Sequence, residues 1–171
     1  MFKNPNSYMY EARNSTTDSW GKDSTGLIKY TFDQYGFRNQ NNYNESPQYV
    51  FFGCSLLFGI GVDIENVFTK KFQCWNFGLA GRYTEDQILD CYSEFKKLKI
   101  DCKVIFVWRN RDLLPDLNLG QDHKIYHCLP YRSKPKNHIR LMDNLDYDVS
   151  GTHWGIKTHQ KFYKLLSHFL Q

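Results

Sequence analysis

Short apolar runs of β type, each stopped by a glycine, alternate in this chain with segments of helical periodicity. The run 49–52 ends at Gly53, and the run 72–77 ends at Gly78. Near-continuous apolar strands of this length are typical of parallel strands that are buried on both faces. The alternation therefore predicts an α/β fold with three layers, α/β/α, in which right-handed crossovers join the strands of a central, mainly parallel sheet.

Further elements follow from the same periodicities. The helix that begins at Thr84 has the clearest signals, because Thr84 and Gln87 form a capping box and apolar residues recur at helical spacing from Ile88 to Leu98. The terminal segment 158–170 carries one apolar stripe, which predicts an amphipathic helix. The other expected elements are a strand over 27–32, a turn over 34–38, a short helix over 63–71, and strands over 103–108 and 124–129.

The length of 171 residues is that of one domain with an ordinary core. Hydrophobic residues make up 41% of the chain and charged residues 23%, as in soluble globular proteins. The aromatic share of 17% is high, and core packing explains it more simply than a groove for a saccharide or an acyl group. Residues 1–26, rich in Asn, Ser, Thr, Asp and Gly, are expected to form an extended or loosely ordered arm, which leaves 27–171 as a single domain.

The net charge of +4 is mild and is not gathered into a long run. The densest basic stretch contains Arg132, Lys134, Lys136 and Arg140, in a segment predicted to be a loop. A solvated loop is expected there, since surfaces that bind nucleic acid usually combine denser charge with a recognisable motif. The sequence thus predicts no nucleic-acid partner, and it leaves the oligomeric state open.

Five cysteines are widely spaced and mostly lie in apolar stretches. This pattern predicts free, buried thiols in a reducing compartment rather than a disulfide scaffold. The sequence has neither an apolar run long enough to cross a bilayer, which takes about 20 residues, nor the pattern of a secretory signal. A cytoplasmic protein with no membrane partner is expected, and a part of a virion or a trimmed secreted protein is the alternative.

Three of the predicted strands end in small or polar clusters, at 53–61, 76–81 and 108–110. The carboxyl ends of parallel strands share one rim of a sheet, so these three turns are expected to lie side by side. Ser55 leaves its strand between Gly53 and Gly59, a setting that permits a tight turn and leaves backbone N–H groups free to bind an oxyanion. A plainer alternative is that the glycines only end the strand and that Ser55 caps the next helix.

The motifs Gly53-Cys-Ser55-Leu-Leu-Phe-Gly59, 76–81 and Gly151-Thr-His153-Trp-Gly155 occur in the order of conserved blocks in the SGNH/GDSL hydrolases, which this chain resembles. The first motif is similar to the variant of the family's first block in which Gly-Asp-Ser becomes Gly-Cys-Ser. The resemblance covers 48–171, and 32–38 looks like the lead-in found in some carbohydrate-type esterases of the family. It implies the flavodoxin-like α/β/α fold of that family.

The resemblance also implies a role for four residues of this sequence. Ser55 would be the nucleophile and His153 the base that takes its proton. The N–H groups of Ser55 and Gly78 and the side-chain amide of Asn110 would bind the oxyanion. The implied activity is that of a serine esterase or acylhydrolase that needs no cofactor and removes O-acyl groups. Acetyl is the expected acyl group, and a saccharide or another small molecule is the expected carrier.

Two positions depart from the family's pattern. The third block normally reads Gly-x-Asn-Asp, whereas this chain has Trp108-Arg-Asn110-Arg. The family's aspartate lies three residues before the histidine, where this chain has Ser150. Asp148 is the nearest acid and would complete a Ser-His-Asp triad if the loop bulges. Otherwise a backbone carbonyl would orient the imidazole of a Ser-His dyad.

Other sites have weaker patterns. His123, His127 and Cys128 have a spacing that could serve a metal, but a loop followed by a strand explains three ligands without a fourth more simply, so no metal is predicted. Cys54 is expected to be a small buried thiol. His159 is expected near the start of the last helix, in a role separate from that of the base.

Two further functions stay open. The missing aspartate favours a catalytically weak or inactive SGNH-fold module with a binding or structural role. The retained serine, glycine, asparagine and histidine oppose this alternative. An unrelated flavodoxin-like domain is the other alternative, and its phosphate loop would need more Ser, Thr and Gly than 53–61 provides.

Overall fold

The structure of the chain is a computed structural model. It describes residues 30, 33, 35–39, 43, 45–79, 85–108, 125–129, 138–140 and 154–170, with the backbone alone described at residue 85 and in 125–129 and 138–140. The expected N-terminal arm, 1–26, lies outside the described residues. So does the expected strand 27–32, except for Tyr30.

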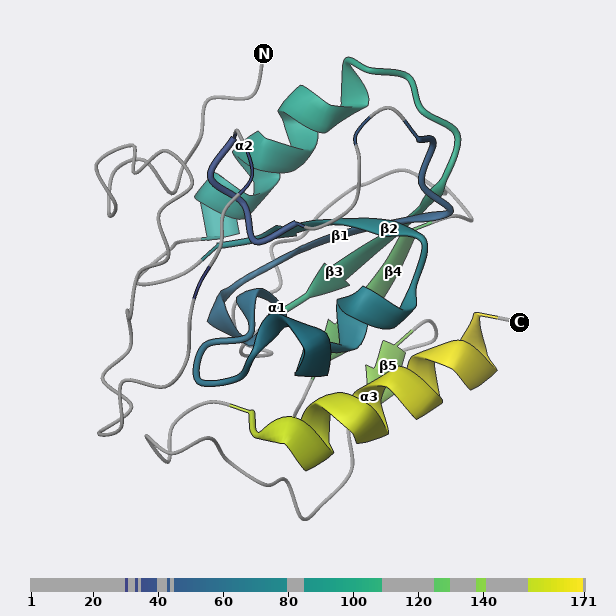
Figure 1. The fold of residues 1–171 in the computed structure, drawn as a ribbon. Helices are drawn as coiled ribbons and strands as arrows, with labels where there is room; N and C mark the ends of the chain where they lie inside the picture. The colour runs from purple at the N-terminus through teal and green to yellow at the C-terminus, as the bar shows by residue number, and fades with distance from the viewer. Residues whose placement is uncertain are drawn as a thin grey trace.

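Five strands form one sheet in the order β2-β1-β3-β4-β5 (Figure 1). The bounds are Tyr49–Gly53 for β1, Cys74–Gly78 for β2, Lys103–Val107 for β3, Ile125–Leu129 for β4 and His138–Arg140 for β5. Every neighbouring pair is parallel. The register brings Gly53 at the end of β1 level with Gly78 on one side and with Val107 on the other. The predicted α/β fold with a parallel sheet is confirmed.

Helices lie on both faces of this sheet. The helix α2 (Glu85–Lys96) covers one face, and α1 (Ser55–Phe58) and α3 (Ile156–Phe169) lie on the other (Figure 1). Two 3₁₀ helices, η2 (Ile64–Asn66) and η3 (Phe68–Lys71), connect α1 to β2 and pack against α3. None of the helices in the described ranges combines the length and the apolarity that crossing a bilayer requires.

Aromatic side chains fill the core on both faces. On the α2 face, the ring of Phe52 lies 5.2 to 5.6 Å, between centroids, from those of Phe77, Tyr92, Phe95 and Phe106. On the other face, Phe51 of β1 packs on Phe68 of η3, which packs in turn on Phe162 of α3. These aromatic residues therefore serve core packing, as the sequence predicts.

Two local predictions are wrong. The expected helix 63–71 is divided into η2 and η3 by Val67, whose backbone is extended at φ −71° and ψ 131°. The side chain of Val67 is buried beside Gly59, whereas the next residue, Phe68, packs on α3. The extended backbone at Val67 lets these two side chains contact different partners. The segment around 132–140, predicted to be a loop, ends in β5, whose three residues are too few to show a strand period.

Candidate active site

Ser55 lies directly beyond the carboxyl end of β1. Cys54 separates it from the strand and is the N-cap residue of α1, with extended backbone at φ −89° and ψ −161° and no capping bond from its side chain. Ser55 is therefore the first residue of the helix, and the alternative in which its hydroxyl caps α1 is wrong. The residue is 4% exposed. Its hydroxyl is thus at the buried rim of the sheet without being the helix cap.

The strand order places Ser55 at the topological switch point of the sheet. In the order 2-1-3-4-5 the direction of strand addition reverses at β1 and β3, and open parallel sheets bind ligands outside the carboxyl ends of the strands at such a point. The chain leaves β1 into α1 on one face, whereas α2 on the opposite face leads into β3 (Figure 1). Ser55 therefore occupies the position where this class of fold usually carries its chemistry.

Gly78 ends β2 next to the helix that begins with Ser55. A Cβ atom added at Gly78 would lie 2.6 Å from the backbone nitrogen of Phe58, so α1 can approach the end of β2 only because residue 78 has no side chain. The structure thus brings the predicted nucleophile and one predicted oxyanion donor to the same rim. The N–H of Gly78 donates to Oδ1 of Asn76 at 2.9 Å, so this donor already has an acceptor.

Asn76 is a polar residue in the middle of a wholly buried strand. Only 3% of it is exposed, and its Nδ2 donates to Oγ1 of Thr69 at 3.0 Å and to the carbonyl oxygen of Leu57 at 3.4 Å. The side chain therefore ties β2 to η3 and to α1. The sequence analysis gave it no role, although an asparagine inside an apolar run is a signal that a buried network surrounds it.

Arg38 is a second residue whose role the sequence analysis missed. Its guanidinium is buried, and Nη1 donates to the carbonyl oxygens of Phe58 and Gly59 while Nη2 donates to that of Val62. Burial lowers the pKa of Arg38 to about 10, which still leaves the group charged at neutral pH. A charged residue in the otherwise apolar turn Gly36-Phe-Arg38 was the available signal, since buried cations are rare without partners.

The turn before Arg38 is built on a single carboxylate. Oδ1 of Asp33 accepts from the backbone N–H groups of Tyr35 and Phe37, and Oδ2 accepts from the hydroxyl of Tyr43 at 2.6 Å. Burial raises the pKa of Asp33 against the opposing effect of these hydrogen bonds. The predicted turn at 34–38 is thus confirmed in its described residues, and it delivers Arg38 to the end of α1.

The other three predicted site residues, Asn110, Asp148 and His153, lie outside the described residues. Their roles stay predictions. Trp154, the residue after His153, is described and is buried against Phe162 and His159, with ring centroids 5.2 and 5.7 Å away. Because α3 begins two residues later and packs on η2 and η3, Trp154 lies on the face of the sheet that carries α1.

Of the remaining candidate residues, His159 and Cys54 are described and lie in the core, whereas the side chains of the others are outside the described part of the chain. His159 lies in the first turn of α3, near the start of the last helix as predicted. It is buried and stacks on Phe68 with ring centroids 5.8 Å apart, so it is a core residue. Cys54 is buried, as predicted, and so are Cys74 and Cys91. The side chains of His123, His127 and Cys128 are not described, and among the described residues no group of three His, Cys, Asp or Glu could hold a metal ion.

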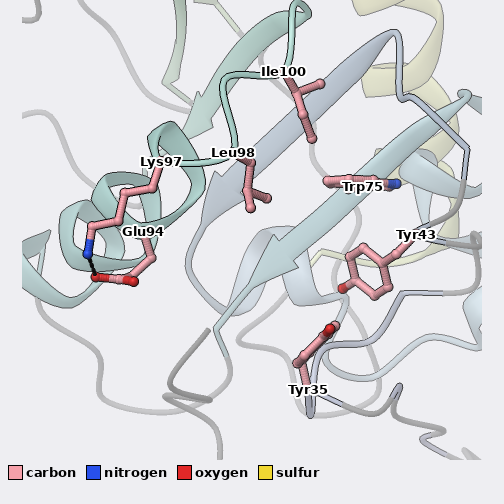
Figure 2. Close-up of a pocket in the computed structure, with 7 residues that line it drawn as sticks. All are labelled: Tyr35, Tyr43, Trp75, Glu94, Lys97, Leu98 and Ile100. Atoms are coloured by element: carbon pink, nitrogen blue, oxygen red, sulfur yellow. Dashed lines mark hydrogen bonds and ion pairs between the residues drawn. The ribbon is translucent and has the colours of Figure 1, made fainter. Parts of the chain in front are cut away.

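A separate pocket opens near the amino ends of the strands (Figure 2). Its volume is about 410 Å³, and Trp75 near the start of β2 and Ile100 before β3 place it at the amino ends of the strands, away from Ser55. Its lining is Tyr35, Tyr43, Trp75, Glu94, Lys97, Leu98 and Ile100, with Glu94 and Lys97 paired. The described lining residues offer aromatic and aliphatic contact, and none of them is a serine, cysteine or histidine.

No family model, curated protein or solved structure gives a significant match to this chain.

Proposed function

We propose that this chain is a serine ester hydrolase with the three-layer α/β/α architecture of the SGNH family, in which Ser55 is the nucleophile. The observation that carries the proposal is the position of Ser55 at the switch point of a parallel sheet, one residue after a buried strand and at the start of the short helix whose last residue packs against Gly78. The order of the sequence motifs from 53–61 to Gly151–Gly155 supports the same assignment.

In the proposed mechanism, His153 accepts the hydroxyl proton of Ser55 while Oγ forms a bond to the carbonyl carbon of an ester. The tetrahedral intermediate then breaks its bond to the alcohol oxygen, and the imidazolium of His153 gives its proton to the departing alkoxide. A water molecule, deprotonated by the same histidine, attacks the acyl-enzyme. This second step releases the carboxylic acid and restores the serine. Asp148 or a backbone carbonyl would orient the imidazole.

The oxyanion of the intermediate would be held by the N–H groups of Ser55 and Gly78 and by the amide of Asn110. The Gly78 N–H would have to exchange Oδ1 of Asn76 for the oxyanion. That exchange is favourable in principle, because a charged oxygen accepts a hydrogen bond about twice as strongly as a neutral amide oxygen does. Losing one such donor typically costs about 3–4 kcal/mol of transition-state stabilisation.

The proposed substrate is an O-acyl ester of a small molecule or a saccharide, with acetyl as the acyl group. A second candidate function is a catalytically weak or inactive SGNH-fold module that binds its partner without hydrolysis. The bond between Gly78 and Asn76, together with Ser150 at the position of the family's aspartate, favours this second function.

A fluorophosphonate probe separates the two functions, because it reacts only with a serine whose hydroxyl is activated. We expect the purified chain to be labelled at Ser55, as located by mass spectrometry of the digested protein, and we expect His153→Ala to abolish the label. His168→Ala is the matched control, since His168 is an exposed histidine of α3 and its loss leaves labelling unchanged. A folded chain that never reacts supports the binding module instead.

A further inference from the structure

The helix that begins with Ser55 is too short to hold its own position. α1 has four residues, whereas isolated helices below about 12 residues are marginal even with favourable sequences. Its backbone must therefore be fixed by contacts from other segments. At the β2 side these contacts come from Asn76 and from the close approach of Gly78.

At the C-terminal end of α1, next to these contacts, the backbone is bound directly by the guanidinium of Arg38. Its Nη1 lies 3.2 Å from the carbonyl oxygen of Phe58 and 2.5 Å from that of Gly59, and its Nη2 lies 2.6 Å from that of Val62. The last carbonyl groups of a helix have no partner within the helix, and a cation there is also favoured by the helix dipole. One side chain thus satisfies three carbonyl groups over five consecutive residues.

The shape of this segment is fitted to the guanidinium. Gly59 has a φ of +77°, and a Cβ atom there would lie 3.2 Å from Nη1 of Arg38 and 2.5 Å from Cγ2 of Val67. Tyr30 supports the other side, with its ring centroid 4.6 Å from Cζ of Arg38 and its hydroxyl accepting from the N–H of Gly61 at 2.8 Å. Arg38 and Tyr30 together hold the chain from the end of α1 through Val62.

In the part of the chain that the structure describes, Arg38 donates its hydrogen bonds to backbone oxygens, and the carboxylate of Asp63 raises its pKa from beyond ion-pair distance. The ion pairs there join Lys70 to Glu65 and Lys97 to Glu94. The hydrogen bonds of this arginine, which is 1% exposed, all end on carbonyl oxygens of one segment among the described residues. Such an arginine serves the position of that segment, because its fixed fork of donors suits the task better than lysine does.

We propose that Arg38 is the positioning residue of the nucleophile: by holding the end of α1 it sets where the hydroxyl and the N–H of Ser55 lie. This inference rests on the proposed function. Its consequence follows from the sensitivity of catalysis to geometry, since a displacement of about 1 Å can cost about 100-fold in rate. Removal of Arg38 should therefore slow the reaction of Ser55 without touching any reacting atom.

The test compares Arg38→Met, Arg38→Lys and Lys103→Met with the unaltered chain. Lys103→Met is the matched control. Nζ of Lys103 also donates to a carbonyl oxygen beyond a helix end, that of Leu170 after α3, but it does so at the amino end of β3, far from the carboxyl end that carries Ser55. Two quantities are measured: the second-order rate constant for fluorophosphonate labelling of Ser55, and the hydrogen exchange of backbone amides in 55–62. Both are measured well below the melting temperature of every variant.

We expect Arg38→Met to lower the labelling rate constant by about 100-fold and to speed amide exchange in 55–62, while Lys103→Met changes neither beyond about twofold. Arg38→Lys keeps the charge but not the planar fork of donors, so its labelling rate constant should lie between those of Arg38→Met and the unaltered chain. A further variant, Arg38→Ala, leaves space for a free guanidinium ion. Low millimolar guanidinium should restore part of its labelling rate and should leave the rate of Lys103→Met unchanged, a result that a general loss of stability would not produce.

The outcomes separate this inference from the proposed function. An unaltered chain that never labels overturns the proposed function, and the exchange measurement then still decides whether Arg38 fixes 55–62. An unaltered chain that labels, with Arg38 variants that label equally fast, overturns only the positioning role. If Arg38→Met does not fold, Arg38→Lys and Tyr30→Phe decide the question, and unchanged labelling in both contradicts the inference.

Discussion

The side chain of Asn76 joins three segments within the buried side of β2. It accepts from the N–H of Gly78 and donates to Thr69 and to Leu57, so its amide is nearly saturated with partners. Removing one side of a buried hydrogen bond costs more than forming it gains, because the remaining group is left without water. At the scale of single residues, the site is therefore held by a few polar groups in an aromatic core.

Replacing Asn76 by alanine should lower the free energy of unfolding by about 2–3 kcal/mol, since it leaves three buried groups without their partner. Gln73→Ala is the control, because the Gln73 amide makes one exposed bond to the carbonyl of Ser46 and its loss should cost less than about 0.5 kcal/mol. Urea denaturation measures both values. Equal stability of Asn76→Ala and the unaltered chain would contradict the assigned network.

Two buried thiols should make the protein less stable in alkali. Burial raises the pKa of Cys91 to about 12, with Glu94 and Asp90 adding to the effect, and burial also raises the pKa of Cys74. Above about pH 9 the unfolded chain loses these protons while the folded chain keeps them. The stability contributed by each thiol is therefore complete below that pH and is lost as the pH rises toward the folded pKa, by up to about 1.4 kcal/mol per pH unit and thiol.

Urea denaturation under reducing conditions between pH 8 and pH 11 measures this loss. We expect Cys91→Ala to flatten the alkaline decline, and Cys102→Ala, at a half-buried position, to leave its slope unchanged. An alkaline slope that is the same in the chain with and without Cys91 would show that its thiol does not contribute.

At the scale of elements, the sequence predicts most of what the structure contains. The strands predicted at 49–52, 72–77 and 103–108 are confirmed as β1, β2 and β3, which bury nearly all their residues, although β2 begins only at Cys74. The helices predicted from Thr84 to Leu98 and over 158–170 are confirmed as α2 and α3 with slightly different bounds. The wrong predictions concern short segments whose conformation depends on tertiary contacts. Val67 divides a predicted helix to fill the space beside Gly59, and β5 is recognised only through its pairing with β4.

The helix α3 is attached mainly through Phe162, which packs on Phe68 at 4.6 Å and on Trp154 at 5.2 Å. Phe162→Ala should lower the free energy of unfolding by about 3–5 kcal/mol through the cavity it leaves. Phe169→Ala on the same helix is the control, since Phe169 is 43% exposed and its removal should cost less than about 1 kcal/mol. Thermal or urea unfolding gives both numbers, and similar losses in the two variants would mean that α3 does not dock through Phe162.

At the scale of the whole molecule, the strand order places the candidate site at the switch point of the sheet. The sequence predicts that the turns after three strands share a rim, but not that β1 lies between β2 and β3, because register and order depend on contacts between distant segments. Ser55 and Gly78 could be predicted as neighbours, whereas the contacts of Asn76 and Arg38 could not, since they arise only when 38, 55–62 and 76 fold together. Asn110, Asp148 and His153 remain predictions.

The central claim is that Ser55 is the nucleophile of an ester hydrolase. The most direct measurement is the steady-state hydrolysis of 4-nitrophenyl acetate by the purified chain and by Ser55→Ala, with circular dichroism to confirm that both are folded. We expect the unaltered chain to exceed the buffer rate and the folded Ser55→Ala variant to lose at least about 1,000-fold in kcat/KM. A folded Ser55→Ala variant that hydrolyses the ester as fast as the unaltered chain would contradict this claim.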